Sequence, residues 1–120
     1  MLKAITLVHK GAMEIGVHSI RSFAFHFAKT HSLDIHADPS IDDNDHQLLM
    51  EAANGMQAKI VTAAERANKI EGMLSKYPKT KEFLNRASYF AKLELCMYEE
   101  TPYLYFDSDI IWLRHVTNLS

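Results

Sequence analysis

The chain has 120 residues, which suffices for one small domain and is too short for two. Hydrophobic residues make up 48% of the sequence and charged residues 23%, as in globular proteins that bury a core. The net charge of -2 lacks the basic balance of nucleic-acid-binding proteins, so we expect no nucleic-acid partner. A single cysteine, Cys96, excludes an intramolecular disulfide.

The sequence shows neither a targeting signal nor a transmembrane segment. The first apolar run, residues 4–8, ends at His9 and is shorter than the apolar region of a signal peptide. No apolar run reaches the ~20 residues that span a bilayer. We therefore expect a cytoplasmic protein without a membrane span.

Strand and helix patterns alternate in the first part of the chain. Residues 2–8 predict a buried strand, and the apolar spacing of residues 20–28 predicts a helix with Ser19 as its N-cap. Residues 33–37 alternate between apolar and polar side chains and predict a second strand.

An acidic segment follows the second strand. Asp42, Asp43 and Asp45 precede an apolar helical pattern over residues 48–56. Negative charge stabilises a helix N-terminus, and the segment lacks the spacing and terminal glutamate of an EF-hand calcium loop. We interpret it as the start of a helix.

The second half continues the alternation. Residues 59–61 predict a third strand, and Thr62 with Glu65 matches a capping box. The helix that it opens is expected to bury Ala63, Ala67, Ile70 and Leu74. Residues 80–98 predict a further helix, and residues 103–106 form a continuous apolar run typical of a strand buried on both faces. The order of elements predicts one α/β domain over residues 1–120, Rossmann-like, with a mostly parallel sheet and flanking helices.

Two carboxylates follow the last predicted strand. In parallel sheets, ligands bind outside the carboxyl ends of the strands, and Asp107 and Asp109 occupy such an end. In an extended chain their side chains would point the same way, about 6 to 7 Å apart. Two carboxylates suit Mg²⁺ or Mn²⁺ held against a diphosphate. Asp-Ser-Asp is also common in ordinary turns, and the tripeptide alone favours a turn over a metal site.

The sequence around these carboxylates resembles a known family. Residues 105–110 read YFDSDI, preceded by a predicted helix with Arg86 and the pair Lys92-Leu93. This arrangement resembles glycosyltransferases of the A-type fold, particularly the glycogenin and galactosyltransferase-like group and its bacterial relatives. Those proteins have a YLDSDI strand after a basic helix, and Phe106 replaces their Leu or Ala. The resemblance covers residues 80–119 and is only architectural before them.

The resemblance implies a donor site for a nucleoside diphosphate sugar, with a UDP-sugar as the expected donor. Asp107 and Asp109 would bind Mn²⁺ or Mg²⁺ and, through it, the diphosphate. Arg86 and Lys92 would contact phosphate or hold the acidic motif, and the loop with His9 would lie near the nucleotide base. The implied donor-binding residues are Asp107, Ser108, Asp109, Arg86, Lys92 and His9.

The resemblance also implies an incomplete fold. Eleven residues follow Asp109, whereas the family has a C-terminal portion about as long as this whole chain, with the acceptor site. We therefore expect the nucleotide-binding half of a longer glycosyltransferase, with a truncated relative without activity as the alternative, and no catalytic residue is predicted. The acceptor stays open, and a second copy is a candidate to cover an exposed sheet edge.

Two other functions stay open. An apolar strand followed by Asp-x-Asp also resembles the nucleophile motif of haloacid dehalogenase-like phosphatases, but that motif normally lies on the first strand. In addition, Ile110 and Ile111 stand where Thr or Val and a small apolar residue are usual. The third candidate is a non-catalytic α/β module that binds a nucleotide or a protein and keeps the two acids as a turn.

Overall fold

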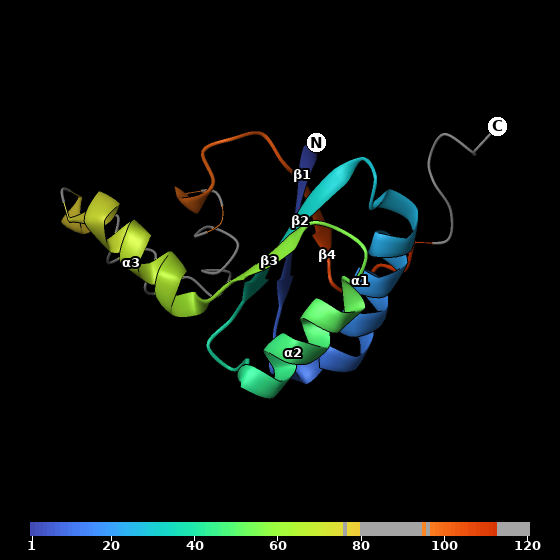
Figure 1. Cartoon of the computed structure of the whole chain (residues 1–120). Coiled ribbons are helices and arrows are strands. Elements are labelled where there is room, and N and C mark those ends of the chain that lie inside the picture. The colour runs from blue at the N-terminus through green and yellow to red at the C-terminus, as the bar shows by residue number, and fades with distance from the viewer. Residues whose placement is uncertain (76, 80–94, 96, 113–120) are drawn as a thin grey trace.

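Parallel strands and helices alternate along the chain, as an α/β fold requires. The computed structural model describes residues 1–75, 77–79, 95 and 97–112. The strands of this described part are β1 (Leu2–Val8), β2 (His31–Ala37), β3 (Ala58–Val61) and β4 (Leu104–Asp107) (Figure 1). Every strand pair is parallel, which confirms the predicted Rossmann-like sheet.

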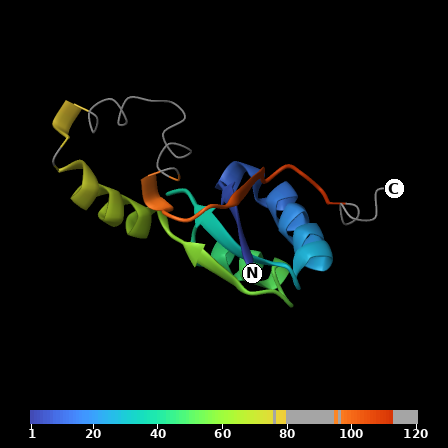
Figure 2. The ribbon, with the colours of Figure 1, turned by 90° about the horizontal axis from the view of Figure 1, so that it is seen from above.

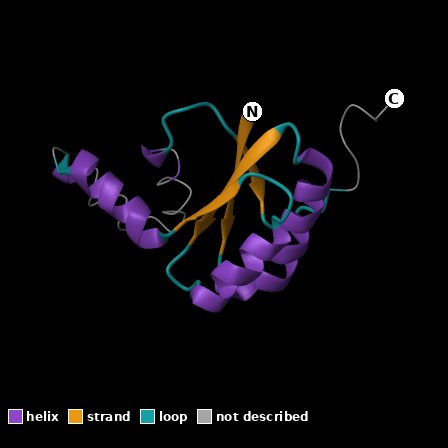
Figure 3. Ribbon diagram, in the orientation of Figure 1, coloured by secondary structure: helices purple, strands orange, loops and turns teal. Residues whose placement is uncertain are grey.

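The strand order is β3-β2-β1-β4, so β1 lies between β2 and β4 (Figure 3). The chain proceeds outward from β1 through β2 to β3 and then returns to the other side of β1 for β4. The register places Leu7 beside His36 of β2 and beside Asp107 of β4. The first four strands of the doubly wound Rossmann sheet have the same order.

The first helix begins earlier than the sequence predicts. A 3₁₀ helix, η1 (Lys10–Ala12), leads directly into α1 (Met13–Phe27). The predicted start after Ser19 is wrong, because Ser19 is buried inside the helix. Gly16, which precedes the predicted helix, also lies within α1. There the helix passes so close to β1 that a side chain on Gly16 would lie 3.3 Å from Val8.

The start of α2 (Asp43–Ala52) confirms the interpretation of the acidic segment. The Asp42 side chain accepts a hydrogen bond from the Asp45 amide at 2.9 Å, and Asp45 accepts one from the Asp42 amide at 3.1 Å. The predicted apolar face is only partly correct, since Leu48 is 49% exposed. The helix ends at Ala52, and Gly55 then turns the chain with a positive φ of 92° that favours glycine.

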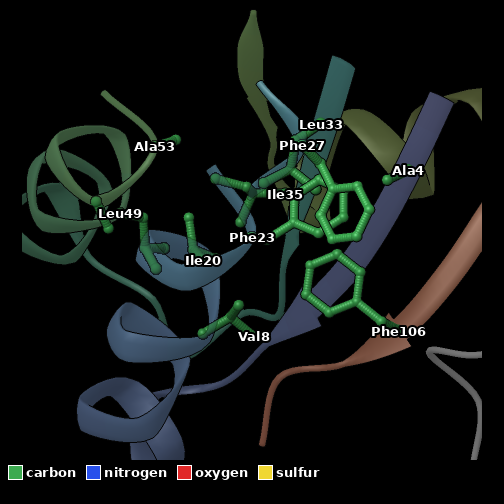
Figure 4. Packing of buried hydrophobic residues seen from close by; sticks show 11 residues of the cluster. Ala4, Val8, Ile20, Phe23, Phe27, Leu33, Ile35, Leu49, Ala53 and Phe106 are labelled. Atoms are coloured by element: carbon green, nitrogen blue, oxygen red, sulfur yellow. The ribbon is translucent and has the colours of Figure 1, made fainter. Parts of the chain in front are cut away.

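Helices α1 and α2 pack on one face of the sheet (Figure 1). At the centre of the core, the ring of Phe23 stacks on Phe27 and on Phe106, with both centroid distances 4.8 Å. Burial of these apolar side chains is the main force that holds the layers together. The cluster, drawn in Figure 4, contains Ala4, Val8, Ile20, Phe23, Phe27, Leu33, Ile35, Leu49, Ala52, Ala53 and Phe106.

The opposite face of the sheet includes charged side chains. Lys3 of β1 lies 3.5 Å from Asp34 of β2 and 3.1 Å from Glu99, which precedes β4. Asp34 is only 4% exposed. The Lys3 ammonium offsets the buried charge of Asp34, and its pair with Glu99 connects the two ends of the described chain.

Helix α3 (Ala63–Leu74) extends away from α1 and α2 (Figure 2). Its N-cap Thr62 accepts a hydrogen bond from the Glu65 amide, as predicted. The predicted buried face is wrong at Ala67, which is exposed, while Arg66 is buried. Arg66 turns inward because its guanidinium donates a hydrogen bond to the Ala37 carbonyl oxygen at 3.1 Å.

Strand β4 is an edge strand among the described strands, rather than a strand buried on both faces. Leu104 is 42% exposed and Phe106 is 3% exposed. This prediction is wrong because Leu104 and Phe106 share one face of β4, and only Phe106 packs under the rings of Phe23 and Trp112. Most of the predicted helix over residues 80–98 lies outside the described residues. Of that segment, Leu95 is buried and residues 97–98 are helical.

Candidate functional site

The carboxyl ends of β1 and β4 lie side by side where the strand order reverses. β1 ends at Val8 and β4 at Asp107. The chain that follows β1 builds the sheet on one side, and β4 occupies the other side. Open α/β sheets bind their ligands at this reversal point. The acidic motif therefore lies at the position where such folds place a ligand.

The motif itself forms a turn, which we call the acid turn (residues 107–110). The Ile110 amide donates a hydrogen bond to the Asp107 carbonyl oxygen at 3.1 Å. The turn that the tripeptide favours is therefore present, and the spacing expected of an extended chain does not apply to residues 107–109. The side chains of Asp107 and Asp109 are nevertheless both exposed to solvent.

Tyr105 contacts the acid turn from within β4. Tyr105 and Asp107 project from the same face, because strand residues two apart share a face. Burial, followed by the negative charges of Asp107 and Asp109, raises the pKa of Tyr105 to about 12. The Tyr105 phenol is therefore neutral at neutral pH beside the acid turn.

Ser108 lies on the side of the acid turn that meets α1. A β-carbon added to Gly16 would lie 3.9 Å from the Ser108 β-carbon and 3.3 Å from Val8. The absence of a side chain at Gly16 thus allows α1 to approach both the end of β1 and the turn. Ser108 is half-buried here, between two exposed carboxylates.

The loop after β1 is the second component of the site. His9 continues the extended backbone of β1, with φ -127° and ψ 162°, and its side chain is exposed. Lys10 Nζ lies 2.5 Å from Asp42 and 3.1 Å from Asp45. The Lys10 amide also donates a hydrogen bond to the Ser40 hydroxyl at 3.0 Å. These contacts fix the loop against the start of α2 and neutralise the charge of Lys10.

A shallow depression of about 310 Å³ lies along η1 and the first turns of α1. It is adjacent to the loop after β1 and does not include the acid turn. Its lining residues are Gly11, Ala12, Glu14, Ile15 and His18.

The acid turn has suitable donors for a hard divalent cation. Mg²⁺ and Mn²⁺ commonly bind one or two protein carboxylates and complete their coordination with water and phosphate oxygens. Asp107 and Asp109 supply two exposed carboxylates in one turn. Within the described ranges, no group of three or more His, Cys, Asp or Glu side chains gathers in a metal-binding arrangement.

A buried His–Arg pair occupies the same end of the sheet. His36 lies in the row of Leu7 and Asp107, one strand farther from the acid turn. The Nδ1 atom of His36 is 3.4 Å from the Arg66 guanidinium. Burial, assisted by the charge of Arg66, lowers the pKa of His36 to about 4, so the imidazole is neutral at neutral pH.

The structure assembles part of the predicted site. It brings the acid turn to the end of β4 and His9 to the adjacent end of β1. Arg86 and Lys92 lie outside the described residues. Sequence reasoning did not single out Tyr105, although its position two residues before Asp107 in a strand was a signal for a shared face.

Comparison with known proteins gives no assignment. No protein-family model matches the chain, and no curated protein matches it. Among the described residues, no helix is long and apolar enough to cross a membrane.

Proposed function

We propose that this chain binds the donor of a metal-dependent glycosyltransferase. The complete enzyme would transfer a sugar from a nucleoside diphosphate sugar, with a UDP-sugar as the expected donor, to an acceptor bound elsewhere. The proposal rests on the resemblance of residues 80–119 to A-type glycosyltransferases, together with the position of the acid turn.

The position of the acid turn is the observation that carries the proposal. A ligand at the reversal point of a Rossmann-like sheet contacts the ends of the two strands that meet there. Here one end presents His9, and the other presents Asp107 and Asp109. A nucleotide along this edge would have its diphosphate within reach of the carboxylates and its base toward the loop after β1.

Each residue has a distinct task in this arrangement. Asp107 and Asp109 would hold Mn²⁺ or Mg²⁺, while Ser108 keeps the turn against α1. A cation bound there neutralises the negative charge that develops on a leaving nucleoside diphosphate. Arg86 and Lys92 are proposed as additional contacts to phosphate.

The charges around the acid turn favour the binding of a cation over the binding of an anionic nucleotide alone. Asp107 and Asp109 are both exposed acids. Lys10 is already paired with two carboxylates at the start of α2. A free diphosphate would meet net repulsion from these acids. Nucleotide binding should therefore depend on the metal.

A non-catalytic nucleotide- or protein-binding module is the second candidate. The hydrogen bond from Ile110 to Asp107 favours it, because the acids then serve as an ordinary strand-end turn. This candidate predicts that neither carboxylate contributes to ligand affinity. The phosphatase is less well supported, since Asp107 lies on β4 rather than on the first strand.

Calorimetric titration of UDP and GDP into the purified chain, with and without Mn²⁺, tests the proposal. We expect binding of UDP only when Mn²⁺ is present and loss of that binding in Asp107→Asn and Asp109→Asn. Asp43→Asn is the matched control, because Asp43 is an exposed carboxylate at the start of α2. Metal-independent binding that survives both substitutions would favour the second candidate. A folded chain that binds neither nucleotide would remove the transferase proposal.

A further inference from the structure

We propose that the outer face of α1 and α2 binds the same face of a second copy of this chain, with Phe25 of each copy inserted into a groove of the other. The surface includes no residue of the acid turn. The inference therefore goes beyond the proposed donor site and does not depend on it.

Phe25 lies on the side of α1 that faces away from the sheet. Its neighbours on the helix, Phe23 and Phe27, face the sheet and are buried. Phe25 is 84% exposed, more than any other large apolar side chain among the described residues. Removal of this ring from water is favourable, and aromatic residues are enriched at protein interfaces. The ring is therefore available to a partner.

A groove of about 320 Å³ lies beside Phe25, between α1 and α2, which run side by side in Figure 1. An apolar cavity of ~150 Å³ accepts benzene, so the groove has room for a phenyl ring. Beyond Glu51 a second depression reaches Met50, which is 41% exposed. The residues that line the groove beside Phe25 include four small ones: Ala24, Ala28, Ala52 and Gly55.

Two opposite charges line the same groove. Arg21 lies one helical turn before Phe25 on α1, and Glu51 lies on α2. Both side chains are exposed, and neither belongs to an ion pair within the described part of the chain. Glu51 accepts a hydrogen bond from the neutral side chain of Gln47 at 3.4 Å. Across a twofold axis, Arg21 of each copy can face Glu51 of the other.

A second copy fits this surface because the projecting ring, the groove and both charges belong to one patch. A closed twofold interface uses the same patch on both subunits, so a side chain that projects from one copy must find its recess on the other. Phe25 adjoins the groove, so two rings can insert side by side in one contact. A ring and a groove on distant surfaces would instead produce open-ended assembly.

Sedimentation velocity of the full chain over a range of concentrations tests the inference. We expect a reversible equilibrium between monomer and dimer, without larger species. Phe25→Ser should weaken the dimer by about 30-fold or more, as the loss of an aromatic hot spot does. Tyr77→Ser is the matched control, because Tyr77 is 62% exposed beyond the end of α3. It should dimerise like the unsubstituted chain.

Charge reversal tests the geometry of the contact. Arg21→Glu and Glu51→Arg should each weaken the dimer, because each places like charges opposite one another. The variant that carries both substitutions exchanges the signs, and it should recover the dimer. Lys29→Glu, which changes an exposed charge outside the groove, should have little effect. Recovery in the double variant cannot result from a loss of stability, and circular dichroism checks that every variant is folded.

Three outcomes would overturn the inference. One is a chain that stays monomeric at the highest concentration. Another is a dimer that Phe25→Ser does not weaken, because that dimer would use another surface, such as an exposed sheet edge. The third is a series of species larger than the dimer, since the contact would then not be closed. Metal-dependent UDP binding is measured separately, so neither proposal fails with the other.

Discussion

Lys10 donates a hydrogen bond to Asp45 across 3.1 Å, which joins the loop after β1 to the first turn of α2. Asp45 is 7% exposed and also accepts the hydrogen bond from the Asp42 amide. The loop that carries His9 is therefore anchored to a helix that lies outside the candidate site. Changes at this anchor should affect the stability of the loop before they affect any chemistry at the acid turn.

Lys10→Met should destabilise the protein at neutral pH and have little effect at very low pH. The hydrogen bond from Lys10 is the main cause that lowers the pKa of Asp42 from 3.8 to about 2. Because the folded-state pKa is depressed, this stabilisation is fully present above pH 3.8 and is lost as the pH falls through about 2. Salt should also reduce it, since the pair is exposed.

Thermal unfolding of Lys10→Met and the unsubstituted chain between pH 7 and about pH 2 tests this prediction. The control is Lys29→Met, an exposed lysine for which the described residues provide no ion pair. A difference in melting temperature that persists unchanged at the lowest pH would exclude the ion pair as its cause.

His36→Gln should flatten the pH dependence of stability below neutral pH. The folded-state pKa of His36, about 4, lies below its ordinary value of 6.5. Protons therefore bind preferentially to the unfolded chain between these values, so stability is complete above pH 6.5 and declines as the pH falls toward 4. The shift corresponds to about 3 kcal/mol of unfolding free energy over this window.

Urea denaturation at several pH values between 4.5 and 7.5 measures this dependence. Glutamine can still accept a hydrogen bond from Arg66 but cannot titrate. His18→Gln, on the exposed face of α1, should leave the pH profile as it is. An identical profile for His36→Gln would show that another group controls acid stability.

Gly16→Val should destabilise the protein, whereas Gly72→Ala should stabilise it. A β-carbon at position 16 would lie 3.3 Å from the buried side chain of Val8. Overpacking of this kind lowers the free energy of unfolding by about 1 to 3 kcal/mol. A β-carbon added at Gly72 in α3 would have no atom within 4 Å. Alanine at this position should raise the free energy of unfolding by about 0.5 to 1 kcal/mol, because glycine is unfavourable inside a helix.

Chemical denaturation of both glycine variants supplies the comparison, and UDP titration supplies a second readout. Gly16→Val should also weaken metal-dependent UDP binding, because α1 contacts Ser108 at this point. Stability that is unchanged by Gly16→Val would show that α1 can move away from β1 without cost.

Trp112→Ala should lower the free energy of unfolding by about 2 kcal/mol. The loss should be smaller than for a fully buried tryptophan, because Trp112 is half-buried. Its ring packs edge-on against Phe27 and Phe106, with centroid distances of 5.2 and 5.7 Å. Its amide donates a hydrogen bond to the Ser22 hydroxyl at 2.8 Å. These contacts anchor the segment after the acid turn across α1.

Trp112→Phe is the matched variant. It should lower the free energy of unfolding by less than about 1.5 kcal/mol, because it keeps an aromatic ring in the cluster. Guanidinium denaturation followed by circular dichroism measures both variants. In the unsubstituted chain, the fluorescence of this sole tryptophan should report the same transition. An earlier fluorescence transition would mean that the segment detaches before the sheet unfolds.

Local sequence patterns predicted the elements more accurately than their exposure. The strands over residues 2–8 and 59–61 and the cap at Thr62 were predictable, because spacing and capping act over a few residues. The wrong assignments at Ala67 and Leu104 share another cause. Exposure depends on which elements pack against each face, and helical spacing or an apolar run does not specify the neighbour.

The sequence by itself determined the α/β class, the placement of Asp107 at a strand end, and the absence of an intramolecular disulfide. The tertiary structure alone decided that β4 lies beside β1, that residues 107–110 turn, and that α1 approaches Ser108 at Gly16. The physical reason is the separation along the chain over which each kind of interaction acts. Strand and helix propensities act between near neighbours, whereas strand order and side-chain convergence depend on contacts between residues about a hundred positions apart, such as Leu7 and Asp107.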